Sequence, residues 1–136
     1  AELFWQGRGV AADRYVDMLE QAKTYIMRNY AQDRLSLQDV ADHVCVSPSH
    51  LSKVFSQETG QTFIEFLTSV RIRRAMVLLK TTNDKSYEIA HQVGYNDAHY
   101  FSNLFKKATG MTTKDFRKQS RTTATLAEWE GATNEA

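Results

Sequence analysis

Residues 40–60 read VADHVCVSPSHLSKVFSQETG, and residues 89–110 read IAHQVGYNDAHYFSNLFKKATG. The two stretches are copies of one pattern, offset by 49 residues at Val44 and by 50 residues from Ser47 onward, so the second copy holds one extra residue in its turn. Each copy predicts a short helix with a buried Ala, a tight turn and a second helix that begins after a capping residue. This layout is typical of a helix-turn-helix, whose second helix commonly lies in the major groove of DNA. The duplication therefore indicates a reader of two neighbouring stretches of one duplex.

Apolar residues at helical spacing predict a helix before the first copy. They lie at i, i+4, i+7 and i+11 and are Tyr15, Leu19, Ala22 and Ile26. The stripe is typical of an amphipathic helix, which we expect to run from about Asp13 to Tyr30. We expect residues 1–12 to be a tail or the end of a linker.

Capping residues mark where the helices of both copies begin. Ser36 is a suitable N-cap for the first helix of the first copy, and Asp39, three residues later, supports the first turn. Ser47 caps the second helix, with Pro48 at the first helical position, where a missing N–H has no cost. In the second copy Asp97 takes the place of Ser47, and its carboxylate also suits the positive end of the helix dipole.

The segment between the copies predicts one helix of about eighteen residues, from Phe63 to Lys80. Its apolar residues form two stripes that are nine residues apart and therefore lie on opposite faces, at about 100° per residue. The stripes are Phe63, Phe66, Leu67 and Val70, then Ile72, Ala75, Met76 and Leu79. We expect one half of the helix to pack against each unit and so to fix their separation. Arg71, Arg73 and Arg74 disfavour the alternative of a fully buried core helix.

The sequence thus predicts an all-α fold of about seven helices, in which two helix-turn-helix subdomains are joined by a central linker helix. The last helix should be short, from Thr113 to Lys118, and should pack through Phe116. The predicted domains are residues 1–12 (tail or linker), 13–62 (first subdomain), 63–80 (connecting helix), 81–119 (second subdomain) and 120–136 (flexible tail, rich in Thr, Ala and Glu).

The composition excludes several other classes of protein. The 136 residues are 42% hydrophobic and 24% charged, and one Pro, six Gly and no run of alternating β-branched residues favour helices. Cys45 is the single cysteine, which excludes an internal disulfide and fits a reducing cytosol, so we expect a cytoplasmic protein. We expect no membrane partner, because no apolar stretch approaches the roughly 20 residues that span a bilayer and no signal peptide is visible.

Positive charge gathers at and after the second helix of each copy. The whole chain carries a net charge of +1, but residues 45–80 carry +3 and residues 101–121 carry +5. A phosphate backbone would lie at these positions, so the distribution favours a nucleic-acid partner. The alternative is that these charges belong to ordinary solvated helices.

The second helix of each copy has an apolar face and a polar face. The apolar residues, which we expect to point inward, are Leu51, Val54 and Phe55 in the first copy and Phe101, Leu104 and Phe105 in the second. The opposite stripe is Ser49, Ser52, Lys53 and Ser56 in the first copy and His99, Ser102, Asn103 and Lys106 in the second. Such side chains can read base edges, since Lys favours guanine, Asn pairs with adenine and Ser is permissive. The alternative is an ordinary exposed polar face.

Several motifs, in order and at the same spacing, resemble the AraC/XylS family of transcription regulators. The first helix-turn-helix of that family is matched by residues 47–55 and 58–60, its connecting helix by residues 71–75 and 78–79, and its second unit by residues 89–90, 93–95, 100–102, 105–107 and 110–112. The resemblance covers roughly Tyr15 to Lys118. It implies a domain of seven helices that places two recognition helices in successive major-groove segments, which recur on one face of DNA about every 10–10.5 base pairs.

The resemblance also implies roles for individual residues and partners. Base-reading residues of the family fall on Ser49, Ser52, Lys53, His99, Ser102 and Asn103. Weaker contacts to phosphate are expected from Ser56, Lys106, Lys107, Lys114 and Arg117. The expected partners are double-stranded DNA, RNA polymerase and an upstream domain of the full-length protein. That domain should be a phospho-receiver, and a sugar-binding or other ligand-binding sensor is the alternative. No cofactor, metal ion or catalytic activity is expected.

Two positions depart from the family pattern. Cys45 stands where Gly94 stands in the second copy, and a left-handed backbone there would cost a non-Gly residue on the order of 1 kcal/mol. Ser49 and Ser52 are smaller than the residues that many family members carry, so the first unit should make few direct base contacts.

Other kinds of site fit the residues less well. His43, Cys45 and His50 have a spacing that straddles a turn and lacks a fourth ligand for zinc. Cys45 as a nucleophile would need an orienting carboxylate and an oxyanion hole, which no nearby pattern provides. The serious alternative is a helical module that binds another protein and no DNA.

Overall fold

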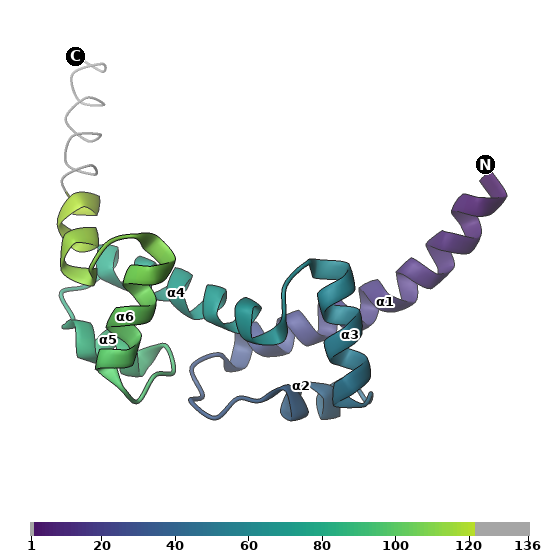
Figure 1. Ribbon diagram of the computed structural model, residues 1–136, viewed down its shortest axis with the longest axis horizontal. Helices are drawn as coiled ribbons and strands as arrows, with labels where there is room; N and C mark the ends of the chain where they lie inside the picture. Colours follow the sequence, from purple (N-terminus) through teal and green to yellow (C-terminus); the bar gives the residue numbers. More distant parts are fainter. Residues whose placement is uncertain (1, 122–136) are drawn as a thin grey trace, which may run out of the picture. The chain divides into compact units, whose positions relative to one another are not determined.

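The computed structural model describes the backbone of residues 2–121 and the side chains of residues 15–121. Within this part of the chain there are seven helices and no strand, as predicted (Figure 1). They are α1 (Glu2–Asn29), α2 (Leu37–His43), α3 (Pro48–Thr59), α4 (Phe63–Thr81), α5 (Ser86–Gln92), α6 (Ala98–Thr109) and a last helix over residues 113–121. No helix among the described residues is both long and apolar enough to cross a membrane.

Both ends of the described chain are more helical than the sequence predicted. Helix α1 begins at Glu2 instead of near Asp13, so it is longer than predicted, and the assignment of residues 1–12 to a tail or linker stays a prediction. Residues 2–12 contain no Pro, and their Glu, Leu, Gln, Arg and Ala residues favour a helix. The last helix continues to Arg121, whose guanidinium donates to the carbonyl of Thr82 at 2.8 Å. The tail predicted beyond it, residues 122–136, lies outside the described residues.

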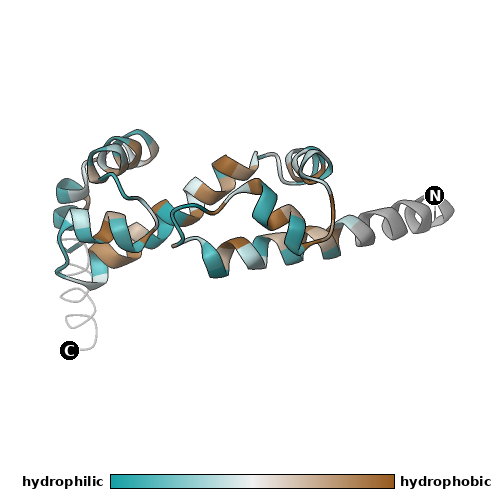
Figure 2. Cartoon of the chain, turned by 90° about the horizontal axis from the view of Figure 1, so that it is seen from below, coloured by the Kyte–Doolittle hydropathy of each residue, from teal (hydrophilic) through white to brown (hydrophobic). Residues whose placement is uncertain are grey.

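The described chain divides into two compact units between Val70 and Arg71, inside α4. The core of the first unit takes residues from α1, α2, α3 and the start of α4. It consists of Leu19, Ala22, Ile26, Leu35, Val40, Ala41, Leu51, Val54, Phe55, Phe63 and Leu67. Figure 2 shows that hydrophobic and hydrophilic residues lie on different faces of these helices, as amphipathic helices require.

The second unit has a core of the same kind, built from α4, α5, α6 and the last helix. Its buried hydrophobic residues are Ile72, Ala75, Leu79, Ile89, Ala90, Val93, Phe101, Phe105 and Phe116. The two predicted stripes of α4 are therefore buried or half-buried, the first in the first unit and the second in the second unit. Arg73 and Arg74 are exposed, whereas Arg71 is buried.

The first helix of each unit, which we name its opening helix, is α1 in the first unit and the second half of α4 in the second. The two are equivalent at an offset of 53 residues. The buried residues Leu19, Ala22 and Ile26 of α1 correspond to Ile72, Ala75 and Leu79 of α4. The helix ends also correspond, since Asn29 Nδ2 donates to the carbonyl of Tyr25 at 2.8 Å and Thr82 Oγ1 donates to the carbonyl of Leu78 at 2.7 Å. Each repeated unit thus includes a helix that precedes the helix-turn-helix pattern seen in the sequence.

The last helix of each unit, which we name its closing helix, is the first half of α4 in the first unit and the helix over residues 113–121 in the second. The two are equivalent at an offset of 50 residues. Thr62 Oγ1 accepts a hydrogen bond from the amide of Glu65 at the start of α4, and Thr112 Oγ1 accepts one from the amide of Asp115 in the last helix, both at 3.1 Å. Each unit consequently contains an opening helix, a helix-turn-helix and a closing helix. Helix α4 serves twice, because its first half closes the first unit and its second half opens the second.

One aromatic pair ties each closing helix to the helix-turn-helix of its own unit. Phe66 meets Phe55 edge-on with ring centroids 5.3 Å apart, and Phe116 meets Phe105 edge-on at 5.6 Å. Because all four side chains are buried or half-buried, these pairs anchor the second helix of each copy to its core.

Candidate nucleic-acid interface

The turn between the two helices of each copy is closed by the same backbone hydrogen bonds. The amide of Val46 donates to the carbonyl of Ala41 at 3.1 Å, and the amide of Tyr95 donates to the carbonyl of Ala90 at 2.9 Å. This six-residue closure is the pattern of a helix end followed by a left-handed residue. It keeps the offset at 49 residues up to Tyr95, which identifies Asn96 as the extra residue of the second copy.

The left-handed residue of each turn lies where the sequence predicted strain. Cys45 has φ 61° and Gly94 has φ 104°. Cys45 is the one non-Gly residue with positive φ that is found in the described chain. The side chain of Cys45 is exposed, and its backbone conformation costs about 1–2 kcal/mol relative to a right-handed one.

The recognition helices, as we name α3 and α6, begin at the predicted caps. Ser47 Oγ accepts a hydrogen bond from the amide of His50 at 3.1 Å, with Pro48 at the first helical position. Asp97 Oδ1 accepts from the amides of His99 and Tyr100 at 2.9 and 3.0 Å. An aspartate here satisfies two amides that a helix N-terminus would otherwise leave open.

The recognition helices also end alike. Gly60 and Gly110 are their C-caps, with φ 74° and 79°. Thr59 Oγ1 donates to the carbonyl of Phe55 at 2.6 Å, and Thr109 Oγ1 donates to that of Phe105 at 2.8 Å. Because both ends of α3 and α6 are fixed by equivalent bonds, residues 50 positions apart occupy equivalent places on the two helices.

The structure bears out the predicted division of each recognition helix into two faces. Leu51, Val54, Phe55, Phe101 and Phe105 are buried, and Leu104 is half-buried. Of the residues predicted to read bases, Ser49, Ser52, Lys53, His99 and Asn103 are exposed and Ser102 is half-buried. These side chains present hydroxyl, ammonium, imidazole and amide groups, which can donate to or accept from base edges. Their role in reading bases stays a prediction.

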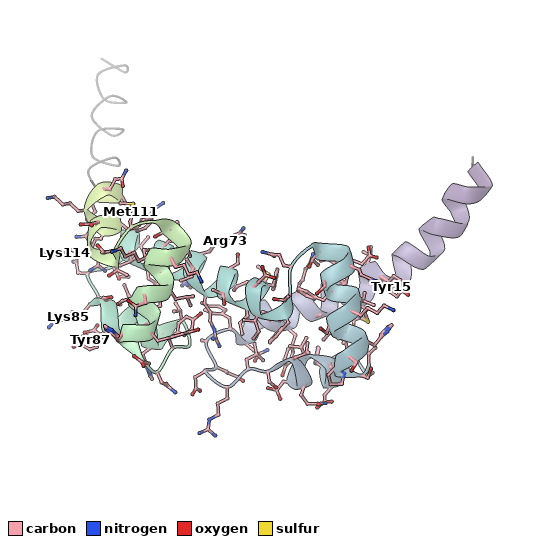
Figure 3. The ribbon with its side chains drawn as sticks, in the orientation of Figure 1. Tyr15, Arg73, Lys85, Tyr87, Met111 and Lys114 are labelled. Atoms are coloured by element: carbon pink, nitrogen blue, oxygen red, sulfur yellow. The ribbon has the colours of Figure 1, made fainter. Side chains whose placement is uncertain are left out.

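The residues predicted to contact phosphate fall into two groups. Lys106 and Lys107 at the end of α6 and Lys114 at the start of the last helix (Figure 3) are exposed, while Ser56 is half-buried. Arg117 is different, because its Nε donates to the carbonyl of Leu79 at 3.0 Å and its Nη2 donates to that of Asp84 at 2.6 Å.

The side chain of Arg117 therefore holds the end of α4 and the loop before α5, a role that sequence reasoning missed. Its equivalent in the first unit is the buried Leu67 of α4. An arginine at the position of a core leucine was the feature of the sequence that could have indicated this structural role.

The described part of the chain contains no group of three His, Cys, Asp or Glu side chains placed to hold a metal ion. His43 and His50 each lie beside a tyrosine instead. The ring of His43 stacks on Tyr25 with centroids 4.3 Å apart, and the ring of His50 is tilted against Tyr15 at 6.4 Å.

Comparison with known proteins identifies relatives of this architecture. Residues 40–119 match the family described as a helix-turn-helix domain. The arabinose operon regulatory protein of Escherichia coli K12 is 37% identical over 99 residues, which cover 73% of this chain and 34% of that protein. The chain thus spans about a third of the length of this relative.

Two solved structures of similar proteins cover the same region. The C-terminal domain of AraT, a response regulator from Geobacillus stearothermophilus, is 40% identical, with a TM-score of 0.73 over 75% of this chain and 84% of that one. The C-terminal domain of the two-component response regulator yesN from Fusobacterium nucleatum is 34% identical, with a TM-score of 0.71 over 74% of this chain and 98% of that one.

Proposed function

The chain belongs to the AraC/XylS family of helix-turn-helix proteins, and from that premise we propose that it is the sequence-specific DNA-binding domain of a transcription regulator. The observation that carries the proposal is the pair of exposed polar faces on α3 and α6, at equivalent positions of two helices that are capped alike. Each face enters one of two successive major-groove segments. The proposed activity is binding and not catalysis.

The two recognition helices read different sequences. On α3, Lys53 donates to guanine O6 or N7, while Ser49 and Ser52 are short and permissive. On α6, Asn103 pairs with adenine and His99 contributes a ring nitrogen, so this helix discriminates more strongly between bases. We therefore expect the half of the target read by α6 to be the better defined half.

Exposed lysines at the C-terminal end of α6 and after it supply the affinity that does not depend on sequence. Lys106, Lys107 and Lys114 can each neutralise a phosphate and release counterions. These contacts orient the domain on the duplex and carry no sequence information themselves.

The relatives support two kinds of upstream domain in the full-length protein. Two similar solved domains come from response regulators, which supports an upstream phospho-receiver domain. The similar xylose-binding transcription activator xylR supports the alternative of a sugar-binding or other ligand-binding sensor. As a regulator of transcription the protein would work in the cytoplasm together with RNA polymerase.

Binding to duplex DNA over a range of salt concentrations tests the proposal. The logarithm of the affinity should fall linearly with the logarithm of salt concentration, with a slope of about −0.9 for each phosphate contacted. A slope near zero, or no binding to any duplex at low salt, would favour the alternative of a helical module that binds another protein.

A further inference from the structure

The second unit contains a buried arginine where the first unit is apolar. At the offset of 53 residues, Arg71 on α4 corresponds to Met18 on α1. At the offset of 49 residues, Tyr95 in the second turn corresponds to Val46 in the first. Met18 and Val46 are half-buried hydrophobic residues packed against the first core.

Arg71 and Tyr95 contact each other. Arg71 is 6% exposed, and its guanidinium carbon lies 4.9 Å from the centroid of the Tyr95 ring. The neighbouring Arg73 and Arg74 are exposed, and Arg73 extends away from the ribbon in Figure 3. Because burying a guanidinium is costly unless it is paired, the contact with the Tyr95 ring is one of the interactions that stabilise Arg71 in this position.

Tyr95 connects Arg71 to the start of α6. The ring of Tyr95 lies 5.7 Å from that of Phe101 and 5.9 Å from that of Tyr100, both in the first turns of α6. Phe101 is fully buried, so it anchors this contact in the core. His99 and Ser102, which the proposed function assigns to base reading, are the direct neighbours of these two rings in the sequence.

We infer that Arg71 and Tyr95 are positioning residues for α6. Arg71 fixes the ring of Tyr95 from the α4 side, and this ring fixes the first turns of α6, which carry the base-reading side chains. At the equivalent positions the first unit has Met18 and Val46, and its described contact between α1 and the start of α3 is the more distant ring pair of Tyr15 and His50 at 6.4 Å. Helix α6 is therefore held more rigidly and reads its half of the target more strictly than α3 does. This inference rests on the proposed function, since it concerns the accuracy of the same recognition helix.

Arg71→Met and Arg73→Met form a matched pair of variants, because each removes one positive charge from the same helix. Both are compared with the wild type on a duplex selected from random DNA by the wild type and on a scrambled duplex. Arg73→Met should either lower the affinity for both duplexes by the same factor or leave both affinities unchanged. Arg71→Met should lower the ratio of the two affinities by roughly tenfold, the order of one well-formed base contact. Repeated selection with it should broaden the half assigned to α6 and leave the other half unchanged.

Substitutions of the ring show whether the two residues act together. Tyr95→Phe keeps the aromatic face and should keep the wild-type ratio. Tyr95→Val places the residue of the first unit and should lower the ratio as much as Arg71→Met does. The double variant should be no worse than either single variant. If Arg71→Met shows no cooperative unfolding transition and so does not fold, Tyr95→Phe and Tyr95→Val still test the inference.

Two results overturn the inference. If Arg71→Met and Arg73→Met have the same ratio, or if the effects of Arg71→Met and Tyr95→Val add fully, the pair does not position α6. If the wild type itself does not distinguish the selected from the scrambled duplex, the proposed function fails first.

Discussion

The first and second units share their backbone hydrogen bonds and differ in the side chains around them. The turn, the caps of the recognition helices and the start of the closing helix have equivalent bonds in both units. The side chains at equivalent positions differ, however: Cys45 corresponds to Gly94, Leu67 to Arg117 and Ser36 to Lys85. The two units therefore keep the same backbone bonds at the turn, at the start of the recognition helix and at the start of the closing helix, although some turn, cap and core side chains differ between them.

The start of the first short helix shows how far such divergence goes. Ser36 and Asp39 form a reciprocal capping box at the start of α2, with distances of 3.0 and 3.2 Å. Lys85 occupies the N-cap of α5 and makes no such side-chain bond. In its place the next residue, Ser86, accepts a hydrogen bond from Thr113 Oγ1 at 3.1 Å, which ties α5 to the last helix.

The largest expected effect tests whether the two cores are equivalent. Phe55→Ala and Phe105→Ala each remove a buried ring at the same place in its unit, so each should lower the free energy of unfolding by about 3–5 kcal/mol. Denaturant unfolding measures the change. Tyr87→Ala is the control, because Tyr87 is exposed (Figure 3) and its loss should change stability by no more than about 0.5 kcal/mol. A large cost in one unit only would show that the cores are not equivalent.

The recognition faces should respond to substitution in different ways from the flanking lysines. Lys53→Ala and Asn103→Ala should each cost about 1–3 kcal/mol on the selected duplex and relax the preference at one or two positions. Lys107→Ala should lower the affinity for all DNA sequences by about the same factor. Selection from random DNA with each variant measures the preference, and an unchanged motif for Asn103→Ala would remove Asn103 from the base-reading residues.

Arg117 can be replaced by the residue that the first unit uses. Arg117→Leu leaves the carbonyls of Leu79 and Asp84 without their donor and should lower the free energy of unfolding by roughly 1–2 kcal/mol. The salt dependence of DNA binding should stay the same. A slope reduced by about 0.9 with unchanged stability would instead assign this guanidinium to a phosphate.

The smallest expected effect is at the turn. Cys45→Gly relieves the left-handed strain and should raise the free energy of unfolding by up to about 1 kcal/mol, part of the gain being offset by the greater freedom of Gly in the unfolded chain. The reverse exchange, Gly94→Cys, should lower it by about the same amount. Thermal unfolding of both variants gives the comparison, and equal stabilities would mean that the turns carry no strain.

Most of the fold could be predicted because its determinants are local. Ser47, Asp97 and the capping box of Ser36 act within three residues, and the buried faces of α3 and α6 follow from helical spacing. The early start of α1 was missed, since a helix without Pro or a capping residue gives no signal of where it begins. The faces of the candidate site were predicted for the same local reason.

The contacts that no local pattern predicts join residues far apart in the sequence. Arg71 and Tyr95 are 24 positions apart, and Arg117 lies 38 positions from Leu79. Arg71 is four residues from the buried Leu67 and from the buried Ala75, so helical spacing separates it from the exposed Arg73 and Arg74. Only the packed structure shows that the ring it contacts is Tyr95.

The most direct test of the central claim, that α3 and α6 each read their own part of one target, is to give α6 the reading residues of α3. Since Ser52 and Ser102 are already the same, His99→Ser with Asn103→Lys completes the exchange. Selection from random duplex should then return a target in which the part read by α6 has changed to the sequence preferred by α3, while the part read by α3 is unchanged. An unchanged target, or a change in both parts, would contradict the assignment of the two recognition helices.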